Sequence, residues 1–253
     1  MPVEVSWARL GDAHDGLRSL LDPVERARLD ATPDPATRGR FLVGCALSRL
    51  LLGELLGMPP ADVPLRRVCP RCGGPHGKPR LDAPAGSAAY DFSVTHSGAL
   101  IGVAVCAGAE VGLDVEDADA ALDVDSAARI ALSARESAIL RSLPPADRKP
   151  AFLRIWTRKE AVLKALGVGL HMPLHALEMS PPEAPPTVLA WPDHPAAVRR
   201  ELHLADMVVD GVHPAVVAVA VPRTGSGAGV GPTGVRVTEH DRSGAVSSYG
   251  RLG

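Results

Sequence analysis

The chain has 253 residues, of which 46% are hydrophobic and 22% charged. A chain of this length and apolar content buries a core without disulfides, which excludes disordered and fibrous proteins. The net charge of −2 and the 3% of aromatic residues do not favour nucleic acid or an acidic membrane surface as a partner. Apolar runs stay below the roughly 20 residues that span a bilayer, and the first residues do not form a charged-then-apolar signal segment. We therefore expect a cytoplasmic protein of one or two domains.

Apolar spacing and punctuation by Gly and Pro predict the elements. Residues 35–57 carry apolar side chains at helical spacing, and residues 58–89, rich in Pro, Gly and Cys, leave room for two short strands at most. Ser133 and Glu136 form a capping-box pattern ahead of a later helix. The predicted elements are, in chain order, a strand over 3–7, a helix over 35–57, hairpin strands over 90–97 and 99–106, a strand over 110–116, helices over 133–143 and 147–166, and strands over 186–191, 201–209 and 214–221.

A helix followed by strands occurs once before about residue 107 and once after it. This order predicts an α/β (α+β) fold built as a pseudo-dimer of two similar halves, each a long helix packed on a small, mostly antiparallel sheet. We expect an N-terminal half over 1–107 and a C-terminal half over 108–222 that carries the acidic residues discussed next. Residues 223–253 hold many Gly and Ser residues and little periodic apolar content, so we expect a flexible tail there.

Two carboxylates share one face of the strand predicted over 110–116. The period of two in a strand places Asp114 and Glu116 on the same side. Like charges this close repel, and a site that keeps both ionised usually supplies a hard cation such as Mg²⁺. The alternative is a solvated strand end, to which Asp117 and Asp119 downstream would belong.

The helix predicted over 147–166 carries a third acid. Trp156, Glu160 and Lys164 are spaced four residues apart and form one stripe along the helix. A carboxylate and an ammonium therefore share that stripe. The alternative is an ordinary stabilising helix pair between Glu160 and Lys164, worth roughly 0.2–0.5 kcal/mol.

Two further segments offer groups that suit phosphate oxygens. His96 lies at the end of a hairpin strand between hydroxyl residues, and Lys78 stands next to a proline. Taken alone, a histidine of this kind is more often a surface residue, since nothing local identifies its partner.

The four segments resemble, in this order, the motif series of the 4′-phosphopantetheinyl transferases, and in particular the surfactin-synthetase-activating (Sfp-like) type. The resemblance covers about residues 40–170 by motif, and its most specific part is the last motif together with the acidic strand before it. The motifs are Gly77-Lys78-Pro79, the segment 92–97 (FSVTHS), the segment 112–116 (GLDVE) and the segment 156–164 (WTRKEAVLK).

The resemblance implies an enzyme of the holo-acyl-carrier-protein synthase type. It would transfer the 4′-phosphopantetheine arm from coenzyme A to a serine of an acyl or peptidyl carrier protein and release adenosine 3′,5′-bisphosphate. Magnesium is the implied cofactor and coenzyme A the substrate. The carrier would belong to fatty acid, polyketide or nonribosomal peptide synthesis, and the pseudo-dimeric organisation implies a monomer with its site between the halves.

The resemblance also implies residue roles. The implied magnesium ligands are Asp114, Glu116 and Glu160. Glu160 would also take the proton of the carrier serine, directly or through water, and Lys164 would neutralise or protonate the leaving phosphate.

The implied coenzyme A contacts are Arg40, Lys78, Thr95, His96 and Lys164. Arg40 would grip the 3′-phosphate, a role that Arg38 or Arg28 would fill equally well. Thr95 stands where the family more often has serine and keeps the hydroxyl.

Cys69, Cys72 and His76 form a Cys-x-x-Cys knuckle with a histidine four residues on. Structural zinc sites use four ligands, and the chain has no second pair of this kind, so we expect a reduced turn without zinc. Two alternatives to the transferase remain. One is another metal-dependent phosphoryl transferase or a nuclease that uses the same acids, and the other is a zinc-knuckle adaptor that binds a partner without catalysis.

Overall fold

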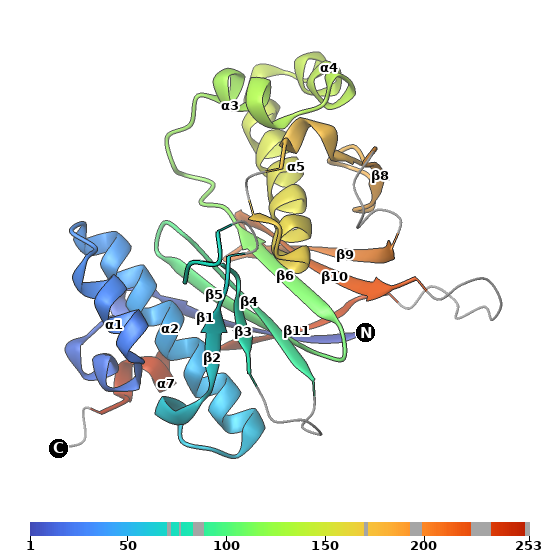
Figure 1. Cartoon of the computed structure of the whole chain (residues 1–253). Coiled ribbons are helices and arrows are strands. Elements are labelled where there is room, and N and C mark those ends of the chain that lie inside the picture. Colours follow the sequence, from blue (N-terminus) through green and yellow to red (C-terminus); the bar gives the residue numbers. More distant parts are fainter. Residues whose placement is uncertain are drawn as a thin grey trace.

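The computed structural model describes residues 1–69, 72–75, 77–82, 89–169, 172–192, 199–223 and 234–250. The predicted fold class is confirmed: two long helices, α2 and α5, each lie on a small sheet, and the two sheets meet near the middle of the molecule (Figure 1). Pairing within the sheets is antiparallel except between the two strands at one edge.

The sheet of the N-terminal half has the strand order β11-β1-β5-β4. Its strands are β1 (Pro2–Arg9), β4 (Tyr90–Ser97), β5 (Leu100–Ala107) and β11 (Arg236–Asp241). The helix α2 (Pro35–Leu56) begins where the Asp34 side chain accepts a bond from Thr37 N, and it ends at Gly57, whose φ of 64° suits glycine. Leu47 and Leu52 of α2 pack with Phe92 and other apolar side chains of the sheet to form one core.

The sheet of the C-terminal half has the strand order β6-β10-β9. Its strands are β6 (Glu110–Val115), β9 (Arg200–Val209) and β10 (His213–Pro222), and α5 (Pro145–Leu166) packs against β6 and β10. Around α5 lie α3 (Val124–Ala131), α4 (Ala134–Ser142), the 3-10 turn η5 (Leu174–Ala176) and the short strands β7 (Glu178–Met179) and β8 (Val188–Ala190). The capping box predicted at Ser133 and Glu136 is present at the start of α4.

Gly112 sets the distance between β6 and α5. A Cβ atom at this position would lie 1.9 Å from Ala161 O and 2.4 Å from Ala165 N, both in α5. Because glycine has no side chain, the helix can touch the strand directly. The close approach brings Glu160 and Lys164 of α5 beside Asp114 of β6.

Short elements complete the N-terminal half. The 3-10 turns η1 (Leu10–Asp12), η2 (Asp15–Leu20) and η3 (Pro60–Asp62) and the helix α1 (Pro23–Asp30) border α2, and β2 (Leu65–Arg67) pairs with β3 (Pro79–Leu81). These two strands are the short ones that the sequence allows between residues 58 and 89.

The structure differs from the flexible tail expected after residue 222. Within that segment, β11 pairs in parallel with β1, and α7 (Ser243–Ser248) buries Val246 completely against the N-terminal half. The indole Nε1 of Trp7 donates to Glu239 at 2.9 Å. The chain therefore returns to its first strand and covers an edge that would otherwise carry unpaired backbone groups. Its few apolar residues gave no strand signal in the sequence.

Candidate active site

The predicted acidic residues come together where β6 meets α5. Asp114 is 4% exposed and Glu160 is 8% exposed. Burial raises the pKa of both Asp114 and Glu116, and the Asp114 charge contributes to the shift of Glu116. Burial raises the pKa of Glu160 to about 7. The charges of Asp114 and Glu116 add to this rise, and the charge of Lys164 opposes it. The three carboxyls therefore sense one another electrostatically, which a set of separately solvated acids would not do.

Lys164 connects this acidic group to β4. Its Nζ donates to Asp114 Oδ1 at 2.6 Å and to Thr95 Oγ1 at 3.1 Å. The Thr95 hydroxyl in turn donates to Asp114 Oδ1 at 3.2 Å. Thr95, Asp114 and Lys164 thus form one hydrogen-bonded set that spans both halves of the molecule. Lys164 therefore forms its ion pair with Asp114 of β6, and the described contacts show no ion pair between Lys164 and its helix neighbour Glu160.

The Glu116 carboxylate is held at both oxygens. Trp156 Nε1 donates to Oε1 at 2.7 Å, and the Ser97 hydroxyl donates to Oε2 at 3.1 Å. Phe152 stacks on Trp156 with ring centroids 6.0 Å apart. The sequence placed Trp156 on the right stripe but gave Ser97 no role. The only signal for Ser97 was the polar residue at every second position of β4.

The donor set fits a hard divalent cation. Among the described residues, Asp114 Oδ2 and Glu160 Oε1 are buried oxygens that find no hydrogen-bond partner. Unpaired buried carboxylate oxygens are costly, and oxygen ligands of this kind are those that Mg²⁺ prefers. A cation between Asp114 and Glu160 would satisfy both atoms.

A second group of ligand atoms lies just beyond the end of β6. Asp117, Asp119 and His213 each offer one atom, and within the described part of the chain these atoms lie within 4.8 Å of one another. His213 Nδ1 already accepts a bond from Ala118 N, and Asp117 Oδ1 accepts one from Asp119 N. The three ligand atoms lie close together because these hydrogen bonds hold the chain after β6 in a capped turn.

Arg40 and His96 line one cavity in the N-terminal half. The cavity has a volume of about 210 Å³ and also includes Arg28, Phe41 and Arg67. Burial, followed by the charge of Lys164, lowers the pKa of His96. Arg40 donates to Gly98 O at 3.1 Å, so its guanidinium stands beside the hairpin that carries His96.

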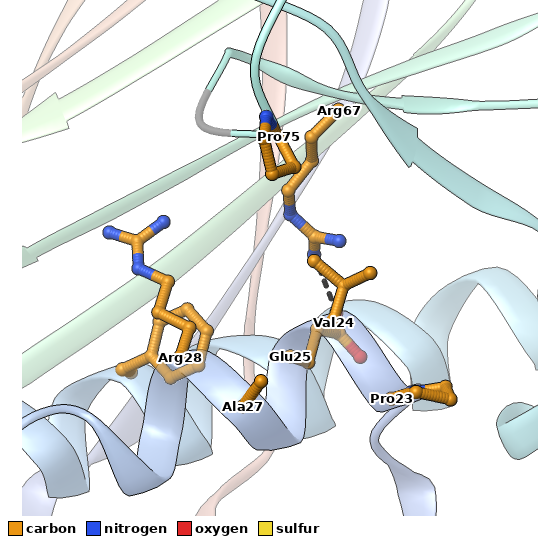
Figure 2. Close-up of a pocket in the computed structure, with 8 residues that line it drawn as sticks. Pro23, Val24, Glu25, Ala27, Arg28, Arg67 and Pro75 are labelled. Carbon is orange, nitrogen blue, oxygen red and sulfur yellow. Dashed lines mark hydrogen bonds and ion pairs between the residues drawn. The ribbon is translucent and has the colours of Figure 1, made fainter.

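A second cavity of about 500 Å³ shares three residues with the first, Arg28, Phe41 and Arg67. Figure 2 shows the Arg28 guanidinium and Arg67 on opposite sides of the space above α1, with Arg67 bonded to Glu25. The Arg28 guanidinium lies 4.8 Å from the centre of the Phe41 ring. The sequence offers three arginines for the 3′-phosphate of coenzyme A. Arg28 and Arg40 line these cavities, whereas Arg38 is exposed on α2 and lines neither of them.

Two lysines of the predicted motifs form ion pairs and hydrogen bonds inside the protein. Lys78 Nζ donates to Asp91 at 2.5 Å, and the pair lies between β4 and α5. Lys159 Nζ is fully buried and donates to Glu136 at 2.5 Å and to the carbonyl oxygens of Ala131 and Leu174. Lys159 therefore ties α3 and α4 to α5.

The cysteine knuckle is partly outside the described residues. Cys69 is buried, Cys72 is exposed, and Gly74 N donates to Cys72 Sγ at 3.4 Å. His76 lies outside the described residues. The expectation that no zinc binds here stays a prediction.

Comparisons with known proteins identify the family of the chain. The sequence model of the 4′-phosphopantetheinyl transferase superfamily matches residues 110–219. The chain is 32% identical to the 4′-phosphopantetheinyl transferase HetI of Nostoc sp. over 67% of this chain and 68% of that protein. It is also 32% identical to the 4′-phosphopantetheinyl transferase AcpT of Salmonella typhimurium, over 56% of this chain and 65% of that protein.

The site is thus a buried acidic group joined to a lysine, between two α/β halves. The chain belongs to the 4′-phosphopantetheinyl transferase superfamily. A holo-(acyl-carrier-protein) synthase structure from Thermotoga maritima matches 45% of this chain and 64% of that chain at 20% identity, with a TM-score of 0.37. That similarity is too low to assign residues. No helix of the described residues is long and apolar enough to cross a membrane.

Proposed function

We propose that this protein transfers 4′-phosphopantetheine from coenzyme A to a serine of an acyl or peptidyl carrier protein, with Mg²⁺ as cofactor. The observation that carries the proposal is the pair of buried, unpartnered carboxylate oxygens of Asp114 and Glu160 beside the Lys164 ammonium. Such a pair is costly unless a cation and an anionic substrate complete it. A member of this superfamily that binds coenzyme A and Mg²⁺ would complete it with the substrate pyrophosphate.

Asp114, Glu116 and Glu160 would hold the ion. When bound, Mg²⁺ would supply charge neutralisation to the pyrophosphate, which is the main requirement of phosphoryl transfer. Ser97 and Trp156 keep the Glu116 carboxylate fixed through one bond to each oxygen. Neither donor needs to move for that carboxylate to serve as a ligand.

Glu160 is the proposed base for the carrier serine. Without the ion, burial and the charges of Asp114 and Glu116 raise the pKa of Glu160 to about 7, and a carboxyl shifted in this direction accepts a proton more readily than an exposed one. The serine oxygen would attack the β-phosphate of coenzyme A, and Glu160 would take the serine proton. The bond to the adenosine bisphosphate oxygen breaks, and Lys164 would neutralise or protonate that leaving phosphate.

Arg40, Thr95 and His96 are the proposed contacts for the phosphates of coenzyme A. Arg40 and His96 share the cavity of about 210 Å³, and Arg28 is a second candidate for the 3′-phosphate because it lines the same cavity. The adjoining space above α1 has room for the adenine, with a volume of about 500 Å³ and mostly apolar walls. A separate cavity of about 250 Å³ beside Lys164, with Val94 and Leu163 in its wall, offers room for the pantetheine arm.

Calorimetry with coenzyme A tests the substrate and the ion together. We expect the wild-type protein to bind coenzyme A tightly with Mg²⁺ present and weakly in EDTA. Asp114→Asn should bind weakly in both conditions because it removes one charge from the ion site. A wild-type protein that binds no coenzyme A would contradict the proposal and favour another metal-dependent phosphoryl transferase.

Fatty acid, polyketide and nonribosomal peptide carriers all stay open as acceptors. A monomer in the cytoplasm stays part of the proposal, with no nucleic acid or membrane partner. Size-exclusion chromatography tests the monomer, and an obligate trimer would contradict the pseudo-dimeric arrangement in which one chain supplies both halves of the site.

A further inference from the structure

The two sheets share an apolar cluster, and beside it β4 and β6 meet through polar side chains. Backbone N–H groups of three β6 residues, and that of Asp117 two residues beyond the end of β6, donate to side-chain oxygens on β4. The four bonds run from Val111 N to Asp91 at 2.8 Å, from Leu113 N to Ser93 at 3.0 Å, from Val115 N to Thr95 at 3.3 Å and from Asp117 N to Ser97 at 2.9 Å. We call this set of four bonds the seam.

The seam explains the alternating polar residues of β4. β6 pairs with β10 on its other edge, so the N–H groups that face β4 would be buried without partners. Backbone groups buried in this way are costly to leave unpaired. A side-chain acceptor at every second residue of β4 satisfies them although β4 and β6 do not pair as strands.

The seam also orients the acidic site. Ser97 accepts from Asp117 N and donates to Glu116, and Thr95 accepts from Val115 N and donates to Asp114. Each hydroxyl has one proton to donate. The same side chains that join the halves therefore also direct two of the three carboxylates.

Lys78 locks the other end of the seam. Its Nζ donates to Asp91 Oδ2 at 2.5 Å, to Val111 O at 2.8 Å and to Ala165 O at 3.3 Å. Asp91 Oδ2 is the oxygen that also accepts the first seam bond. Ala165 O is in the last turn of α5, where carbonyl groups need partners from outside the helix. One ammonium thus ties together the segment before β3, β4, β6 and the end of α5.

An ammonium has three protons, and all three of Lys78 are in use. The side chain is 9% exposed and its partner Asp91 is 13% exposed. A phosphate of coenzyme A would have to replace one of these internal bonds to reach Lys78.

We propose that Lys78 is a positioning residue: through Asp91 it fixes α5 and β6 against β4, and so sets the distance between the phosphate contacts of the N-terminal half and Glu160 and Lys164 of the C-terminal half. This inference rests on the proposed function, because it assumes that coenzyme A spans both halves. It replaces the direct coenzyme A contact that the family resemblance implied for Lys78.

A double-mutant cycle separates the two roles. Lys78→Met keeps the length of the side chain but leaves the Asp91 carboxylate buried without its cation. Lys78→Met/Asp91→Asn removes both charges, while the amide oxygen still accepts from Val111 N and the amide nitrogen can donate to a freed carbonyl. Lys78 also lines the cavity of about 250 Å³ beside Lys164. Lys149→Met is the matched control, because Lys149 lies at the start of α5 and lines another cavity that does not include Lys78.

The readouts are the melting temperature and the dissociation constant of coenzyme A at 20 °C, where circular dichroism shows the variants to be folded. We expect Lys78→Met to melt about 10 °C lower and to bind coenzyme A at least about tenfold more weakly. The double variant should recover both values, with coenzyme A affinity within about threefold of wild type. Lys149→Met should change neither value.

Two results would overturn the proposal. A double variant that recovers its melting temperature but still binds coenzyme A weakly would make Lys78 a direct ligand. A Lys78→Met variant that melts earlier but binds coenzyme A normally would make Lys78 purely structural. If Lys78→Met does not fold, the double variant alone still decides between these roles. A wild-type protein that binds no coenzyme A would contradict the proposed function instead, and melting temperatures would then still show whether Lys78 and Asp91 are coupled.

Discussion

Replacing Glu160 by glutamine should stabilise the protein while it abolishes transfer. Glu160 is buried beside two other carboxyls, and its pKa is raised to about 7 from an ordinary value of 4.5. Ionising it therefore costs more in the folded chain than in the unfolded chain. The extra stability of the protonated carboxyl is complete below about pH 4.5 and is lost as the pH rises through about 7.

The size of the effect follows from the two pKa values. A tenfold change in a proton equilibrium is worth about 1.4 kcal/mol, so ionisation of Glu160 costs the fold about 3 kcal/mol at pH 8 and less than about 1 kcal/mol at pH 5. Glutamine has the same shape and no charge. In EDTA, Glu160→Gln should therefore be more stable than wild type by about 3 kcal/mol at pH 8, or about 5–10 °C in melting temperature for a chain of this size.

Urea or thermal denaturation at pH 5, 6, 7 and 8 measures this difference. Glu183→Gln, which changes an exposed glutamate, is the control and should leave stability nearly unchanged at each pH. Adding Mg²⁺ at pH 8 should stabilise wild type and not Glu160→Gln, because ligand binding to the folded state adds to its stability. A variant that is less stable than wild type at pH 8, or a difference that does not change between pH 5 and pH 8, would refute this account of the acidic site.

Three further predictions address other parts of the structure. Arg40→Ala should weaken coenzyme A binding roughly 10- to 100-fold, because it removes a charge-assisted hydrogen bond, and should leave the binding of dephospho-coenzyme A unchanged. The control Arg38→Ala should change the affinity for neither ligand. Equal losses of affinity for both ligands in Arg40→Ala would contradict a 3′-phosphate contact. In urea denaturation, Gly112→Ala should lower the free energy of unfolding by about 3 kcal/mol or more, because the new Cβ meets the α5 backbone. Gly11→Ala, which has open space around it, should leave that free energy nearly unchanged. Truncation after Pro222 should destabilise the protein by at least about 2 kcal/mol through loss of β11 and the buried Val246, and a truncated chain with unchanged melting temperature would restore the view of a dispensable tail.

The local periods of the sequence predicted which acidic side chains share a face of their strand or helix. The period of two in β6 and the spacing of four in α5 each place their polar side chains on one face, and both patterns are visible without the fold. Their meeting depends on Gly112, which lies in the same motif as Asp114 and lets the helix approach the strand. The same motif therefore contains both an acidic side chain and the glycine that lets α5 approach it.

Contacts between elements far apart in the chain were not predictable in the same way. Lys78 and Lys159 stand in the motifs that carry the family resemblance, yet their ammonium groups bind Asp91 and Glu136 inside the protein. A buried lysine and a phosphate-binding lysine look alike in sequence, because only the packing of the neighbouring helix or strand decides which partner the ammonium meets. The strand β11 was missed for a related reason, since it depends on the free edge of β1 rather than on an apolar pattern of its own.

The most direct test of the proposed activity is a mass measurement on carrier proteins. The purified protein is incubated with coenzyme A, Mg²⁺ and a panel of apo acyl and peptidyl carriers, with Asp114→Ala as the inactive control. We expect at least one carrier to gain the mass of one 4′-phosphopantetheine group on its serine with the wild-type protein, and none to do so with the variant. No mass gain on any carrier, or the same gain with Asp114→Ala, would contradict the proposed activity.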